Sequence, residues 1–210
     1  MAIITLPTTL MIGSACGMGQ RRFDLLSQSE PTGAQQVRLL APPRWTLNLV
    51  QPDKLRLAEA GAWVALLAQL RGRVNVLAAC DPVRPAPLGT LRGALTLAAL
   101  AGAGATAISV TGGAGQAGKT LLAGDWLSIG AGLGSSQQVM VMATTTTNAS
   151  GVASVAIEPP LRTGFAISAV VTWDKPLAYY RLQNDASSWT YGGGGTLVSG
   201  IALDLMETWS

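Results

Sequence analysis

The sequence GAGQAGKT, at residues 113–120, matches the phosphate-binding loop pattern G-x-x-x-x-G-K-[ST] at every required position. In such a loop, backbone N–H groups and the N-terminus of the following helix bind the phosphates, while Lys and Ser or Thr contact the terminal phosphate and magnesium. The helix is therefore part of the chemistry. Here Lys119 and Thr120 are followed by LLAGDWLSIG, where Gly124 and a strand beginning at Asp125 leave too little length for a helix. We interpret the match as a tight turn between strands.

The side chains needed for catalysis or metal binding are scarce. Histidine is absent, which removes the usual general base, the Ser-His and Cys-His nucleophile pairs and most zinc sites. The acidic residues include no close pair at a spacing typical of carboxylate catalysis, and none of the three lysines, Lys54, Lys119 and Lys175, is an evident base. The sequence therefore predicts no catalytic residue, no cofactor and no metal ligand, and we expect a protein that is not an enzyme.

The charge pattern points to a protein that works through its surface. Only 12% of the residues are charged, and eleven of the 14 basic residues are arginine. So few charges leave much neutral surface, which favours a subunit covered by neighbours; a monomer with a bland surface is the alternative. Because the basic residues are scattered rather than gathered in one patch, we expect no sequence-specific binding of nucleic acid. Cys16 and Cys80 form no C-x-x-C pair, and we interpret them as reduced, packed thiols.

Two apolar segments could be mistaken for membrane signals. Residues 1–17 carry no Lys or Arg before the apolar run and are interrupted by Pro7, so we interpret them as a first strand and turn rather than a signal peptide. Residues 93–118 are uncharged and long enough to span a bilayer, but they consist mostly of Ala, Gly and Thr. Short strands separated by turns explain this segment better. We therefore expect no membrane insertion.

The first ninety residues predict a strand, a helix and a second strand. Residues 57–71 are rich in helix formers, and Gly72 follows as a left-handed cap. The large apolar side chains of this helix recur at the spacing of one buried stripe: Trp63, Leu66, Leu67 and Leu70. The alternating sequence RWTLNLVQP before the helix and VNVLAACDP after it, closed by Pro82, are typical of strands.

The rest of the chain predicts short strands and almost no helix. Runs rich in Val, Ile, Thr, Leu and Met, separated by Gly and Pro turns, predict strands at residues 106–111, 125–129, 139–145, 152–157, 166–172 and 197–206. The run YGGGGT at 191–196 is typical of a flexible connector before the last strand. The predicted fold class is mainly β: a β-sandwich or barrel domain carrying one α-helix, plus a second small all-β domain.

A series of loose motifs runs through almost the whole chain: FDLLSQSEPTG, RWTLNLVQP, AEAGAWVALLAQLRGRVN, CDPVRPAPLGTLRG, GAGQAG, LAGDWLSIG, NASGVASVAIEPPLR, YYRL and SGIALDLMETW. In their order and spacing these motifs resemble the distal tail protein family of long-tailed bacteriophages, whose members form the ring between the tail tube and the host-recognition tip. The resemblance implies that GAGQ-x-G has no phosphate-binding role. It also implies a second domain inserted before the last strand, so we expect residues 1–90, completed by 196–210, to form the helix-bearing domain and residues 91–195 the inserted one.

The resemblance implies a structural protein of the virion tail tip, or baseplate, assembled in the bacterial host cytoplasm. Its partners would be copies of itself in a closed, usually hexameric ring, the tail tube protein on one side and the tail hub or tip proteins on the other. Arginine is favoured in interfaces, and residues in the Gly-rich turn could lie over adjoining rings. The candidate subunit-interface residues are Arg21, Arg22, Arg44, Arg92, Gly113, Gln116 and Lys119; the alternative for each is an ordinary surface residue.

A carbohydrate-binding module that contacts the host surface is the competing prediction. Small β domains with exposed Trp and Tyr can stack these rings on sugars. Such residues gather late in the sequence: Trp173, Tyr179, Tyr180, Trp189 and Tyr191. The alternative reading of the same residues is that they cover the seam between the two domains.

Overall fold

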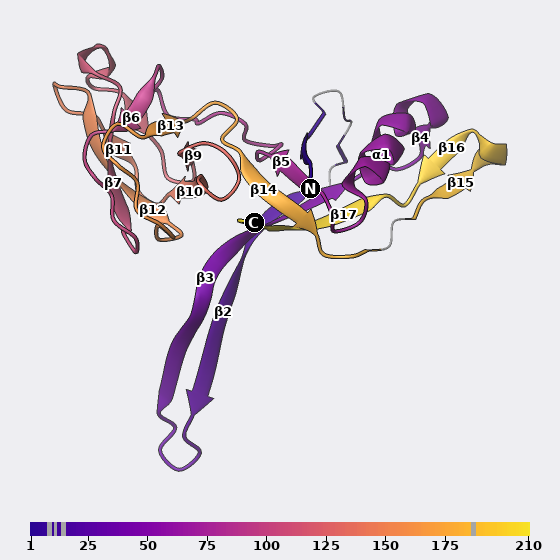
Figure 1. The fold of residues 1–210 in the computed structure, drawn as a ribbon, viewed down its shortest axis with the longest axis horizontal. Coiled ribbons are helices and arrows are strands. Elements are labelled where there is room, and N and C mark those ends of the chain that lie inside the picture. Colours follow the sequence, from indigo (N-terminus) through magenta and orange to yellow (C-terminus); the bar gives the residue numbers. More distant parts are fainter. Residues whose placement is uncertain (8–9, 11, 14–15, 186–187) are drawn as a thin grey trace.

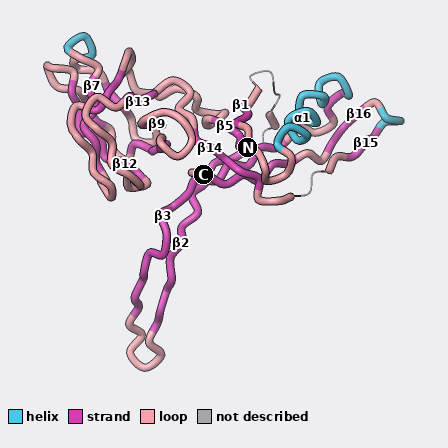
Figure 2. Tube along the Cα trace, in the orientation of Figure 1, coloured by secondary structure: helices cyan, strands magenta, loops and turns pink. Residues whose placement is uncertain are grey.

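A computed structural model describes residues 1–7, 10, 12–13, 16–185 and 188–210. The protein is mainly β, with a single α-helix in its described part, several sheets and one small closed barrel (Figures 1 and 2). The predicted fold class is therefore confirmed. Among the described residues, no helix has the length and apolar character needed to cross a membrane.

A six-stranded sheet forms the centre of the molecule. Its strands, in spatial order, are β1 (Ile3–Thr5), β5 (Val76–Ala79), β14 (Ala178–Leu182), β17 (Ala202–Glu207), β3 (Gln35–Val50) and β2 (Gly17–Gln28). Only the β1–β5 pairing is parallel. The alternation predicted for RWTLNLVQP is present: Trp45, Leu47 and Leu49 are buried, while the residues between them are partly exposed. Part of the turn predicted within residues 1–17 lies outside the described residues.

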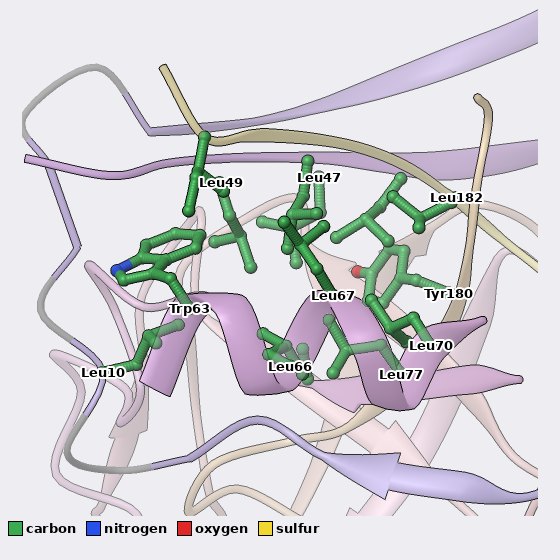
Figure 3. Close-up of a cluster of buried hydrophobic side chains, with 14 of the residues drawn as sticks. Leu10, Leu47, Leu49, Trp63, Leu66, Leu67, Leu70, Leu77, Tyr180 and Leu182 are labelled. Atoms are coloured by element: carbon green, nitrogen blue, oxygen red, sulfur yellow. The ribbon is translucent and has the colours of Figure 1, made fainter. Parts of the chain in front are cut away.

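Helix α1 (Leu57–Leu70) covers one face of this sheet (Figure 3). Trp63 and Leu70 of the predicted stripe are fully buried, and the side chains of Leu47, Leu77 and Tyr180 meet them from the sheet. The helix ends one residue earlier than predicted. Its left-handed turn begins at Arg71 (φ 50°) and continues through the expected Gly72.

A closed six-stranded barrel forms a second core. Its strands, in order around the barrel, are β10 (Gln137–Val141), β12 (Val152–Glu158), β7 (Ala107–Thr111), β6 (Leu95–Leu97), β13 (Val170–Thr172) and β9 (Trp126–Ile129). The interior consists of aliphatic side chains such as Leu127, Val139 and Val155, all fully buried. Next to the barrel, β8 (Thr120–Leu121) pairs with β11 (Thr145–Thr146). Closure leaves the barrel without a free edge strand.

The chain leaves the barrel earlier than the predicted insertion of residues 91–195 implies. The barrel strands end at Thr172, and β14 then pairs with β5 and β17 of the central sheet. The run YGGGGT, predicted to be a flexible connector before the last strand, instead lies in a hairpin formed by β15 (Thr190–Gly192), the 3₁₀ turn η2 (Gly193–Gly195) and β16 (Leu197–Ser199). Strand β16 also pairs with β4 (Leu55–Arg56). Gly200, at φ 86°, separates β16 from β17, so the last predicted strand is two strands.

Candidate interaction surface

The loop that matches the phosphate-binding pattern is a packed turn. A 3₁₀ turn, η1 (Ala114–Gln116), and strand β8 occupy the stretch where the phosphate chemistry requires a helix. The Gln116 side chain accepts a hydrogen bond from the Arg92 backbone N–H at 3.0 Å, and the Thr147 hydroxyl accepts one from Lys119 N–H at 2.9 Å. Gly151 approaches so closely that a Cβ there would lie 1.8 Å from the Gly113 oxygen. These contacts hold the loop against the barrel.

The seven predicted interface residues fall into two separate groups. Arg92, Gly113, Gln116 and Lys119 lie together on the barrel, where Arg92 is engaged within its own chain. Its guanidinium donates to the carbonyl oxygens of Leu91 and Pro87 and lies 4.8 Å from the centroid of the Trp173 ring. The other three residues, Arg21, Arg22 and Arg44, lie together on the central sheet, where Arg21 pairs with Arg44 across β2 and β3.

The far halves of β2 and β3 form a hairpin that extends away from both cores, which we call the arm (residues 23–41; Figures 1 and 2). Its large apolar side chains are exposed by more than half: Leu25 56%, Leu26 57%, Val37 63%, Leu39 58% and Leu40 62%. Exposed apolar side chains gathered in one segment are typical of a binding surface. This arm is not predicted from the sequence.

Both faces of the arm carry apolar side chains. Leu26 lies directly opposite Val37, and Leu39 follows on the same face because side chains alternate along a strand. Leu25 lies opposite Arg38 and therefore points to the other face. A partner that covers only one face would leave Leu25 in water.

The base of the arm is tied to the barrel by an ion pair. The Arg22 guanidinium lies 2.8 Å from the Glu158 carboxylate at the end of β12, and Gln20 donates to the same carboxylate oxygen at 3.5 Å. The register between β2 and β3 shifts on either side of Phe23. Such bulges bend and twist a hairpin, and they mark the point where the arm separates from the body.

A second contact, between the central sheet and the barrel, forms around Trp209. The guanidinium carbons of Arg44 and Arg162 lie 4.5 and 4.2 Å from the centroid of the Trp209 ring, so the ring contacts one cation from the sheet and one from the barrel. Nearby, the buried Glu207 carboxylate accepts a hydrogen bond from Trp45 N–H at 3.1 Å. Burial raises the pKa of Glu207, an effect that this hydrogen bond and the two arginines oppose.

Buried aromatic residues and a network of two aspartates fix the barrel on the sheet. The rings of Trp45 and Trp126 meet edge to face with their centroids 4.6 Å apart, and Trp126 donates to Asp81. Asp125, only 1% exposed, accepts hydrogen bonds from the backbone N–H groups of Leu88, Gly89 and Leu122 and pairs with Arg84. This network orders the connection from β5 to the barrel.

The five late aromatic residues do not form one surface. Tyr180 is fully buried in the sheet core, and its hydroxyl donates to the Gln138 side chain of the barrel. Trp189 packs against the same core, Trp173 packs on the barrel, and Tyr191 is exposed on β15. Tyr180 takes part in the sheet–barrel seam that includes Trp45, and Tyr179 on β14 lines a hollow together with the barrel residues Ser128 and Thr172. The structure thus offers no row of exposed rings among them.

No protein-family model matches the chain, and no curated protein matches it either. Within the described residues, no group of three or more Cys, Asp or Glu side chains is arranged to hold a metal ion. The arm is therefore the strongest candidate for a functional surface.

Proposed function

We propose that this chain is a structural subunit of the distal tail ring of a long-tailed bacteriophage, which joins the tail tube to the host-recognition hub. The observation that carries this proposal is the arm with its five exposed apolar side chains. The order of the motifs along the chain is the basis for the resemblance to the distal tail family. The low content of charged residues agrees with a subunit that is covered by its neighbours.

The energetics of the arm favour a covered state. A two-stranded hairpin alone is marginally stable in water, and the arm has no third strand or helix against it in the described part of the chain. Burying a leucine or valine side chain stabilises a protein by about 1.5–3 kcal/mol. Covering Leu26, Val37 and Leu39 would therefore contribute several kcal/mol to assembly.

The shape of the contact favours a ring. The arm is a protruding ribbon of two strands, whereas the β15–β16 hairpin pairs with a third strand, β4, beside α1. Contact between an arm and the body of another copy joins two different surfaces, and such contacts repeat around a rotation axis until the ring closes. The tail tube and hub proteins would then meet the two flat sides of the ring at the virion tail tip.

Electron microscopy and native mass spectrometry of the purified chain test the proposal. We expect closed rings with a central hole, and loss of these rings in Leu26→Ser/Leu39→Ser. The matched control is Leu100→Ser, which changes a leucine on the barrel that is 76% exposed; this variant should still form rings.

Two results would contradict the proposal. A wild-type chain that stays monomeric at high concentration and on isolated tail tubes would argue against a ring subunit. Saturable binding on a glycan array that is lost in Trp189→Ala would instead support the carbohydrate-binding role.

A further inference from the structure

Three arginines surround one hollow on the open face of the central sheet. Arg44 on β3, Arg181 on β14 and Arg73 in the turn after α1 all line a cavity of about 370 Å³. Arg181 lies opposite Met206, and Met206 opposite Thr46, two residues after Arg44. Side chains alternate along a strand, and both Trp45, next to Arg44, and Tyr180, next to Arg181, are buried in the core with α1. Arg44 and Arg181 therefore point to the opposite, uncovered face.

The positive charge of this hollow is only partly neutralised. None of the three arginines forms an ion pair with a described residue. Arg181 donates to the Ser210 carbonyl oxygen at 2.6 Å, and Arg73 donates to the Gln183 carbonyl oxygen. The Nε atoms of Arg44 and Arg181 are buried without a hydrogen-bond partner in the described part of the chain.

The acid nearest to this hollow neutralises it only in part. Glu207 contributes to the lining, but the residue is 3% exposed and its carboxylate accepts the Trp45 N–H, while its backbone carbonyl oxygen accepts a hydrogen bond from Arg44 at 3.5 Å. The arrangement of guanidinium groups is therefore that of a site for a carboxylate, since arginine binds planar carboxylates through paired hydrogen bonds.

The arm carries carboxylates without a partner. Glu30, in the turn at the far end of the arm, and Asp24 on β2 are both exposed, and neither pairs with a described cation. From Arg22, where the barrel holds the arm, to Gln28 the strand extends about 20 Å. The hollow lies at the base of the arm, since Arg44, which lines it, pairs with Arg21 there. Glu30, at the other end of the arm, therefore lies far from the hollow of its own chain.

We propose that Glu30 of one copy docks into the hollow formed by Arg44, Arg73 and Arg181 of the next copy. This contact rests on the ring proposed above and specifies its geometry: the tip of an arm meets the open face of a neighbouring sheet. The apolar side chains of the arm supply most of the affinity, while the charge contact fixes how far the arm advances, because unlike charges select register and partner.

Charge reversal at both ends tests the docking. Glu30→Arg and Arg73→Glu each place like charges together, so each variant should associate with itself on the order of tenfold more weakly than the wild type. The double variant should associate more tightly than Glu30→Arg alone, because the new carboxylate at position 73 can pair with the new arginine at position 30, but more weakly than the wild type, because Arg44 and Arg181 remain positive. Sedimentation over a range of concentrations gives the dissociation constants.

Matched controls separate this contact from a general effect of charge. Lys54→Glu makes the same change of charge at an exposed residue that lies outside the arm and does not line the hollow, and it should associate like the wild type. Glu30, Lys54 and Arg73 are all exposed, so thermal melts of their variants should match the wild type.

The possible outcomes are distinct. Single variants that form rings as readily as the wild type, or a double variant that is no better than the weaker single variant, would overturn the docking and leave the ring in place. A wild-type chain that does not associate at any concentration would overturn the ring and the docking together.

Discussion

The barrel and the arm both consist of antiparallel strands that carry leucine and valine, and they differ in where those side chains lie. In the barrel, Leu127 and Val155 are fully buried, whereas in the arm Leu39 and Val37 are exposed by 58% and 63%. The barrel closes its edges and fills its interior. The arm has no interior, so its apolar side chains can stabilise the protein only when a second surface covers them.

The same contrast occurs within a single strand. The second half of β3 alternates buried and partly exposed side chains under α1, but the first half, from Gln35 to Leu40, is exposed at every position. The change comes after Leu40, next to the register shift at Phe23. One strand thus contributes to the core at one end and to an exposed surface at the other.

The largest loss of stability should come from the core under α1. Trp63→Ala removes a fully buried side chain, which should lower the free energy of unfolding by about 4 kcal/mol. Tyr191→Ala, at a ring that is 56% exposed, should change it by under about 0.5 kcal/mol. Urea denaturation measures both, and equal losses would show that the burial described for Trp63 is incorrect.

The junction between sheet and barrel should come next. Asp125→Ala leaves three backbone N–H groups and Arg84 without their acceptor, so we expect a loss of about 3 kcal/mol in urea denaturation. Asp174→Ala, at an exposed acid next to the same connection, should lose under about 0.5 kcal/mol. A small effect at Asp125 would indicate a barrel that is loosely attached.

A smaller effect, dependent on pH, should come from Glu207. Burial raises its pKa above the ordinary value of 4.5. The folded chain therefore binds this proton more tightly than the unfolded chain, and stability falls as the pH rises from 4.5 through the raised pKa. Glu207→Gln removes this titration. The melting temperature of the variant minus that of the wild type should therefore rise across that pH window and stay constant above it. Parallel pH profiles would contradict this account.

The smallest effect on the folded monomer should come from the arm. Leu26→Ser, measured by urea denaturation at a concentration too low for assembly, should change the free energy of unfolding by under about 0.5 kcal/mol, because the side chain is already 57% exposed. A loss of 2 kcal/mol or more, the size of a core truncation, would place Leu26 in an intramolecular contact and remove the contrast between arm and barrel.

The elements that follow a local pattern could be predicted from the sequence. In the stripe around Trp63 and the alternation at Trp45, the spacing of the apolar residues along the sequence predicts which face is buried. The arm could not be predicted in this way, because a hairpin with both faces exposed has no buried face to set a period. The contact between Arg22 and Glu158 joins residues 136 positions apart, and the hollow joins arginines of three elements, so only the fold brings them together.

The pairing of Arg22 with Glu158 has a mechanical consequence. Glu158 is the last residue of β12, which is hydrogen-bonded on both sides within the closed barrel. The arm is therefore attached to a strand that is held on both sides and not to a free loop. Because Arg22 is more than half exposed, the ion pair stabilises this one orientation of the arm relative to the barrel by at most about 1 kcal/mol.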